Sequence, residues 1–100
     1  MVRWMRSARV AGGKFPQAVA WSKEMAKFAE KYQGVSSVNV FLDVFGESGT
    51  IRWVVDYQDL ATLENVQNQI LTDQEYWKKI GQAQDFFVDG TIHDMVMRSL

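Results

Sequence analysis

The segment VSSVNVFLDV, residues 35–44, is followed by FGESGT (45–50) and then by IRWVVDY (51–57). Both outer segments alternate apolar and polar side chains with a period of two, which is typical of β-strands. Gly46 and Gly49 in the middle segment supply the conformational freedom that a chain reversal needs. Together the three segments predict a β-hairpin.

The hydrophobic pattern also predicts how the two arms pair. If Val44 faces Ile51, residues directly opposite each other share a face of the hairpin. One face is then apolar: Val38, Val40, Leu42 and Val44 beside Ile51, Trp53, Val55 and Tyr57. The other face is mixed: Asn39, Phe41 and Asp43 beside Arg52, Val54 and Asp56. In this register Asp43 lies directly across from Arg52, which predicts a favourable cross-strand ion pair. A slip of one residue would exchange the two faces.

A strand and a helix are predicted before the hairpin. Residues 2–10 alternate like a strand, and Gly12 and Gly13 end the alternation. Pro16 opens a helix, where its fixed φ is tolerated. The helix should end at Gly34. Its apolar stripe consists of Ala18, Trp21, Met25, Phe28 and Tyr32.

Two helical segments and a strand are predicted after the hairpin. Asp59 is a good N-cap for a helix that carries Leu60, Leu63, Val66 and Ile70 on one side. Thr72 and Glu75 have the spacing of a capping box, which predicts a break near Thr72 and a new helix to about Gln84. Its buried side would consist of Tyr76, Trp77, Ile80 and Ala83. Residues 91–98 read as a final strand.

The resulting order, β-α-β-β-α-β, predicts an α+β fold of the ferredoxin-like type. Right-handed crossovers around a central hairpin give a four-stranded antiparallel sheet with the helices on one face. One hundred residues suit a single domain, residues 1–100.

Composition excludes several classes of function. The net charge is −1 and no basic stripe occurs, so we expect no nucleic-acid partner and no anionic membrane surface. The first residues predict neither a signal peptide nor a transmembrane helix. Cysteine is absent, which excludes disulfides and thiolate chemistry and favours a cytoplasmic location.

The helices can cover only one face of the sheet, and the apolar face of the hairpin suits them. The open face is then predicted to present these pocket or interface residues: Arg3, Met5, Ser7, Arg9, Asn39, Phe41, Asp43, Arg52, Asp56, Met95 and Met97. His93 is assigned to the same face, because Ile92 and Val96 suit the helix side. A surface of this mixture usually contacts a partner or a ligand. We expect it to pack against a second copy in an isologous homodimer.

The whole chain resembles the dimeric α/β-barrel superfamily, which includes antibiotic-biosynthesis monooxygenase-like, NIPSNAP-like and stress-responsive barrel proteins. The resemblance rests on the element order, on the segment DQEYW (73–77) and on FFVDGTIHD (86–94). It implies that two sheets pack face to face, and that each protomer keeps a pocket between its sheet and its helices or at the barrel. Tyr76 and Trp77 are candidates for the mouth of a pocket, because the predicted break near Thr72 leaves room there. The four tryptophans otherwise fall on helix-covered positions, where most are expected in the core.

Three functions remain open from the sequence. The first is a homodimeric barrel protein that binds a small, partly apolar organic molecule. The second is a cofactor-independent monooxygenase, isomerase or cyclase in which His93, the only histidine, is the general base. The third is a structural dimer with no pocket.

We expect no metal and no cofactor. One histidine among scattered carboxylates has no recognised metal-ligand spacing. Haem-degrading relatives place the iron-binding histidine on a helix, and neither predicted helical region here contains one. Gly12 and Gly13 before Lys14 lack the spacing of a phosphate-binding loop.

Overall fold

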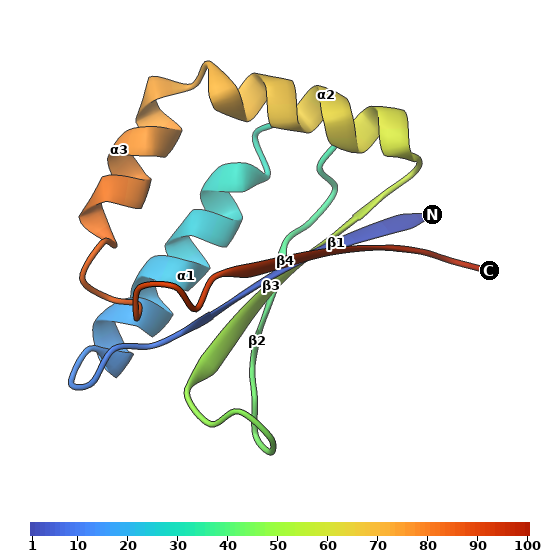
Figure 1. Ribbon diagram of the computed structural model, residues 1–100. Helices are drawn as coiled ribbons and strands as arrows, with labels where there is room; N and C mark the ends of the chain where they lie inside the picture. The colour runs from blue at the N-terminus through green and yellow to red at the C-terminus, as the bar shows by residue number, and fades with distance from the viewer.

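The computed structural model describes all 100 residues and has the predicted ferredoxin-like α+β fold (Figure 1). Its elements, in chain order, are β1 (Val2–Arg9), α1 (Phe15–Ala29), β2 (Asn39–Leu42), β3 (Thr50–Tyr57), α2 (Leu60–Leu71), α3 (Gln74–Gln82) and β4 (His93–Arg98). The four strands form one sheet in the order β2-β3-β1-β4, and every neighbouring pair is antiparallel. All three helices lie on the same side of the sheet (Figure 1).

The hairpin pairs two residues away from the predicted register. Leu42, not Val44, lies opposite Ile51, and Phe41, not Asp43, lies opposite Arg52. A shift of two residues keeps every side chain on its predicted face, because the side-chain period of a strand is two. The apolar and mixed faces are therefore those that the sequence predicted, while the direct pairs are not.

The first strand of the hairpin is also shorter than predicted. β2 covers only Asn39–Leu42, and the connection to β3 begins at Asp43. Val44, predicted to face the helices, is 81% exposed in this connection. Val35 and Val38 lie outside the strand but still pack against the core, so their apolar pattern reflects burial without sheet pairing.

The helix boundaries follow capping chemistry. Helix α1 ends at Ala29, and turns carry the chain to Gly34, whose φ is +103°. A Cβ at Gly34 would lie 2.8 Å from Thr62 Cγ2, so both the backbone and the close approach of α2 require glycine. Asp59 caps α2 as predicted, since its carboxylate accepts a hydrogen bond from the Thr62 amide.

The predicted break between α2 and α3 is present, but its cap is Asp73 and not Thr72. Asp73 has an extended backbone and accepts a hydrogen bond from the Glu75 amide, whereas the Thr72 hydroxyl bonds back to the Gln69 carbonyl. Aspartate and threonine are both good N-caps, so the sequence alone did not separate them.

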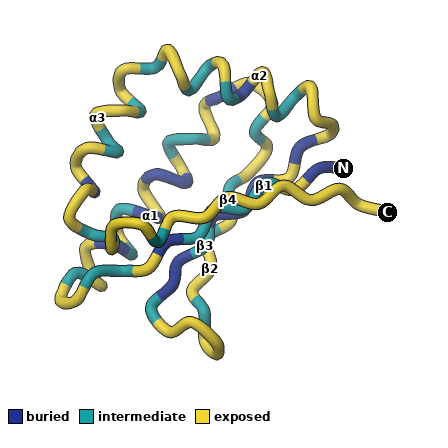
Figure 2. The backbone as a smooth tube through the Cα atoms, viewed as in Figure 1, coloured by how far each residue is buried: buried dark blue, intermediate teal, exposed yellow.

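The buried residues form two clusters on the helix-facing side of the sheet. One surrounds Ile51 and Trp53 under α1, and the other surrounds Val55 and Val66 under α2. Helix α3 contributes no buried residue and spans the space above the sheet as a largely exposed segment (Figure 2). Helix α3 therefore contributes less to the packed core than α1 and α2 do.

Candidate functional site

A cavity of about 660 Å³ lies between the sheet and the three helices. Its floor is the helix-facing side of β1 and β3, including Trp4, Ala8 and Val55, and its walls come from α1, α2, α3 and the segment that leads into β4. Twenty-two of its 28 lining residues are hydrophobic. Polar side chains are few, which gives the cavity the general make-up of a site for a small organic molecule.

All four tryptophans line this cavity. They lie at helix-covered positions, as predicted. Trp53 is a core residue and Trp4 and Trp21 pack against the same core cluster, whereas Trp77 is 49% exposed. Trp53 and Phe87 are in edge contact at 5.5 Å between ring centroids, and Trp21 makes edge contacts with both rings. The Trp21 indole nitrogen donates a 3.1 Å hydrogen bond to the Lys79 carbonyl, which joins α1 to α3. The buried Trp53 indole nitrogen has no hydrogen-bond partner.

Arg6 is the one cationic side chain on the cavity wall. It projects from β1 between Trp4 and Ala8, and its guanidinium lies 5.4 Å from the centre of the Trp4 ring, a cation–π distance. Its Nε and Nη2 atoms donate hydrogen bonds of 2.7 and 2.8 Å to the carboxylate of Asp94, directly opposite on β4. The hydrogen bonds to Asp94, with a smaller contribution from Tyr76, raise the pKa of Arg6, so it stays charged.

Two tyrosines of α3 and β3 add polar atoms to the lining. Tyr76 reaches the cavity from α3, as the sequence suggested, and packs edge-on against Trp77 at 5.1 Å. Tyr57 lies at the end of β3, where burial raises the pKa of its hydroxyl. The Tyr57 hydroxyl is therefore a neutral hydrogen-bonding group at ordinary pH.

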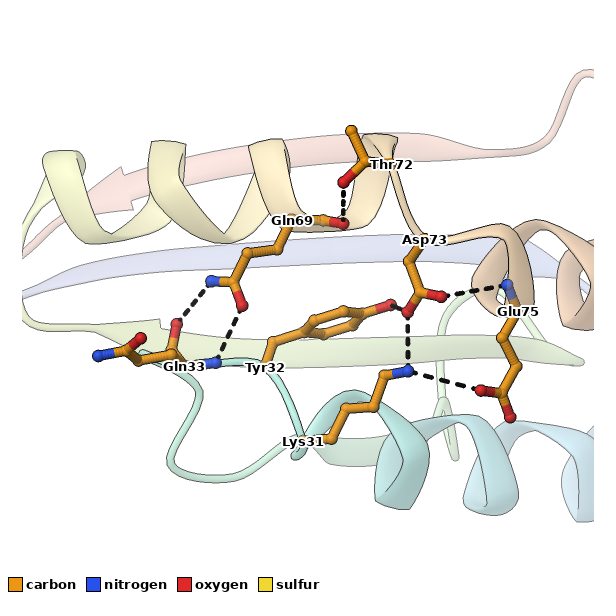
Figure 3. Close-up of polar contacts among 7 residues, drawn as sticks. All are labelled: Lys31, Tyr32, Gln33, Gln69, Thr72, Asp73 and Glu75. Carbon is orange, nitrogen blue, oxygen red and sulfur yellow. Dashed lines mark hydrogen bonds and ion pairs between the residues drawn. The ribbon is translucent and has the colours of Figure 1, made fainter.

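The junction between α2 and α3 is tied to the end of α1 by a polar cluster, here called the latch: Lys31, Tyr32, Asp73 and Glu75 (Figure 3). The Tyr32 hydroxyl donates a 2.6 Å hydrogen bond to Asp73, and Lys31 pairs with the same carboxylate at 2.8 Å. Beside it, the Gln69 side chain bonds both backbone groups of Gln33 (Figure 3). The latch holds the start of α3 over the cavity.

The latch sets the ionisation of its own members. Lys31, followed by Tyr32, lowers the pKa of Asp73 to about 2. Burial and the neighbouring Asp73 carboxylate raise the pKa of Tyr32. Asp73 is therefore a fixed negative charge, and Tyr32 a fixed donor, over the whole neutral range.

The predicted open-face residues lie on the side of the sheet away from this cavity. Strand pairing places Arg3, Met5 and Ser7 opposite Met97, Met95 and His93 on β4. The same three residues lie opposite Asp56, Val54 and Arg52 on β3. Among the predicted pocket or interface residues, Tyr76 alone lines the large cavity. Phe41 borders a smaller hollow of about 330 Å³ between β2 and α1.

His93 lies on the open face of the sheet, as the alternation of the last strand predicted. It pairs with Ser7, so it points away from Arg6 and the cavity. Three carboxylates of the sheet region are each paired with an arginine: Asp43 with Arg52, Asp56 with Arg3 and Asp94 with Arg6. No ion pair or hydrogen bond links any of them to His93.

Sequence reasoning missed Arg6 and Asp94 as site residues. Arg6 interrupts the apolar face of the first strand, and Asp94 lies between Ile92 and Val96 on the helix-facing side of the last strand. Two opposite charges at apolar positions of two strands were the available signal, because a buried charge needs a partner. The sequence did not show that these strands are neighbours with these two residues in register.

No group of three or more His, Asp or Glu side chains is arranged to hold a metal ion. No helix is long and apolar enough to cross a membrane.

A comparison with protein-family models finds no match, and a comparison with curated proteins finds none either. Solved structures do match. A NIPSNAP domain protein from Burkholderia xenovorans superposes with a TM-score of 0.82 at 12% identity, over 100% of this chain and 95% of the other. A NIPSNAP family protein from Agrobacterium tumefaciens gives 0.80 at 13% identity, over 99% and 92%. An antibiotic biosynthesis monooxygenase gives 0.76 at 9% identity, over 100% and 99%. The resemblance stated from the sequence is thus confirmed at the level of the fold.

Proposed function

We propose that this protein is a homodimer that binds a small, largely apolar organic molecule in the cavity between its sheet and its helices. The observation that carries the proposal is the cavity itself: about 660 Å³, with an aromatic and aliphatic lining and few polar groups. Small-molecule sites generally have volumes of about 300–1,000 Å³ and linings of this kind. Protein interiors otherwise contain few voids larger than a water molecule.

The cavity disfavours the third function considered from the sequence, a structural dimer with no pocket. A structural role needs a filled interior, and α3 would then pack on the sheet. Instead α3 has no buried residue, and Tyr76, Trp77 and Ile80 line open space.

The dimer is proposed to form through the open sheet face. Met95 on this face is 51% exposed and Phe41 is 55% exposed, and no helix lies on this side to cover them. Its charged groups are largely matched within the protomer, by two-bond pairs between Arg3 and Asp56 and between Arg52 and Asp43. Such a face can be buried against its own copy without leaving these charges unpaired.

The absence of cysteine supports a cytoplasmic setting.

The test of ligand binding uses the one glycine of α3. Gly81 lines the cavity, and a Cβ built there meets no atom within 4 Å. Gly81→Phe should therefore place a ring in the cavity with little disturbance of the fold. We expect the wild type to bind N-phenyl-1-naphthylamine, a neutral apolar fluorophore, and Gly81→Phe to lose at least about tenfold in affinity, equivalent to about 1.4 kcal/mol.

Gly81→Ala is the matched control. It adds only a methyl group, and it should stabilise α3 by up to about 1 kcal/mol because alanine is the better helix former. Its affinity for the fluorophore should stay close to that of the wild type. Equal affinities of the wild type and a folded Gly81→Phe variant would place the bound fluorophore outside the cavity and contradict the proposal.

A further inference from the structure

The charged groups around the cavity are few and unevenly placed. Of the lining residues only Arg6 and Asp89 are charged. Asp89 is exposed in the turn before β4, where solvent screens it. Arg6 instead projects from the sheet, and its side chain is 33% exposed. A charged group on a bound molecule would therefore interact electrostatically mainly with Arg6.

The positive charge of Arg6 is already compensated. Asp94 binds Nε and Nη2 of the guanidinium side by side, which is the strong two-bond geometry of an arginine–carboxylate pair. Asp94 itself is not part of the cavity lining, so it neutralises Arg6 from the β4 side. From within the cavity the pair presents little net charge.

The pair nevertheless leaves hydrogen-bond donors unused. Nη1 of Arg6 makes no hydrogen bond within the protein, and an arginine carries two N–H groups on that atom. The Tyr76 hydroxyl approaches the same guanidinium from α3, and its own O–H is a further donor beside Arg6. A ligand with an acceptor oxygen can satisfy these donors.

We infer that the cavity selects neutral molecules that carry an acceptor oxygen, such as an aryl amide or ketone, over the corresponding carboxylates and amines. The inference rests on the proposed binding function and adds its charge selectivity. A carboxylate would add a second negative charge beside Asp94 in a cavity with mostly apolar walls, and the cost of transferring it from water would not be recovered. An ammonium group would place a second positive charge beside the guanidinium of Arg6, which is unfavourable. A neutral oxygen accepts a hydrogen bond from Nη1 and adds no charge.

The test uses four naphthalenes of nearly equal shape: 2-naphthamide, 2-naphthoate, 2-naphthylmethylamine and 2-methylnaphthalene. Each competes with N-phenyl-1-naphthylamine for the full-length protein at pH 7. The amide should bind at least about tenfold more tightly than the carboxylate and than the amine, and more tightly than the methyl compound. Tighter binding of the carboxylate or the amine would overturn the inference.

Two substitutions test whether the Arg6–Asp94 pair is the cause of the selectivity. In Asp94→Asn the charge of Arg6 is no longer compensated, so the advantage of the amide over the carboxylate should shrink by about tenfold or reverse. In Arg6→Met the affinity for the amide should fall to that for 2-methylnaphthalene. An unchanged amide-to-carboxylate ratio in a folded Asp94→Asn variant would overturn the inference. If that variant does not fold, Arg6→Met and the wild-type series decide.

Asp56→Asn is the matched control, because it alters the equivalent two-bond pair, with Arg3, on the face away from the cavity. Its amide-to-carboxylate ratio should equal that of the wild type. Failure of the proposed function has a different signature: none of the four naphthalenes, including the uncharged methyl compound, would displace the fluorophore from the cavity.

Discussion

Asp43 and Arg52 are joined diagonally across the β2–β3 hairpin. The Asp43 amide donates to the carbonyl of Thr50, which is the residue next to it across the hairpin, and the Asp43 carboxylate accepts two hydrogen bonds, of 2.8 and 2.9 Å, from Arg52. Diagonal neighbours on one face of an antiparallel pair are within reach of long side chains. The ion pair that the sequence predicted is therefore present, although the register that was used to predict it is wrong.

Arg52→Ala should destabilise the protein more than Arg3→Ala. Both arginines make two-bond pairs on the open face, but the side chain of Asp43 is 14% exposed and that of Asp56 is 41% exposed. Removing Arg52 leaves the more shielded carboxylate without its partner, and the hydrogen bonds from Arg52 are what lower the pKa of Asp43. Urea unfolding of the two variants at one protein concentration measures the difference. Equal midpoints would show that the Asp43 pair contributes no more than the exposed one.

The hairpin shows which features of a fold can be predicted from the alternation of apolar and polar residues. Each apolar side chain of β2 and β3 was assigned to the correct face, because a period of two distinguishes faces. The same period cannot distinguish registers that differ by two residues. Val44 and Leu42 are equally good partners for Ile51 in sequence, and the seven-residue connection from Asp43 to Gly49 selects Leu42.

Met95→Lys should weaken the proposed dimer and leave the monomer folded. Met95 lies opposite Met5 in the middle of the open face, on a strand whose side chains are all exposed. A lysine pair related by two-fold symmetry would place like charges in an interface expected to bury roughly 1,200–2,000 Å². Sedimentation should show a dimer for the wild type at micromolar concentration and a shift toward monomer for the variant. A monomeric wild type would rule the dimer out.

His93→Ala should affect association and not ligand binding. His93 faces the open side with Ser7, and the cavity lies on the other side of the sheet. The variant is therefore expected to dissociate at a higher concentration than the wild type, with an unchanged affinity for N-phenyl-1-naphthylamine. Loss of affinity in a variant that remains dimeric would instead restore His93 as a pocket residue and return it to consideration as a general base.

The candidate site was less predictable than the fold because it depends on which strands are neighbours. Tyr76 was placed at a pocket mouth from the helix break near Thr72, a local feature of the sequence. Arg6 and Asp94 are 88 residues apart, and their pairing follows from β1 lying between β3 and β4. A single sequence shows each charge as an isolated exception, and only the three-dimensional pairing shows them as one group.

The latch predicts how stability changes in acid. The pKa of Asp73 is about 2 in the folded protein, and an unperturbed aspartate has a pKa of about 3.9. Because the folded value is the lower one, the ionised carboxylate stabilises the fold above about pH 4, and this contribution is lost as the pH falls toward about 2. Asp73→Asn retains a good N-cap for α3 but cannot ionise.

Asp73→Asn should therefore be less stable than the wild type at pH 5, and the difference between the two should narrow steadily as the pH falls from about 4 to about 2. Urea unfolding of both proteins at a series of pH values, at fixed protein concentration and ionic strength, measures this. In a Lys31→Met background the stability difference caused by Asp73→Asn should also be smaller, because Lys31 is the first cause of the lowered pKa of Asp73. Lys78→Met on α3 breaks no ion pair, so the stability of this variant should depend on pH as that of the wild type does. Hydrogen exchange of the α3 amides should quicken in Asp73→Asn and Lys31→Met, because the latch holds the start of this helix over the cavity. A constant difference in stability between wild type and Asp73→Asn from pH 5 to pH 2 would mean that Asp73 acts only as a cap and not as the charged centre of the latch.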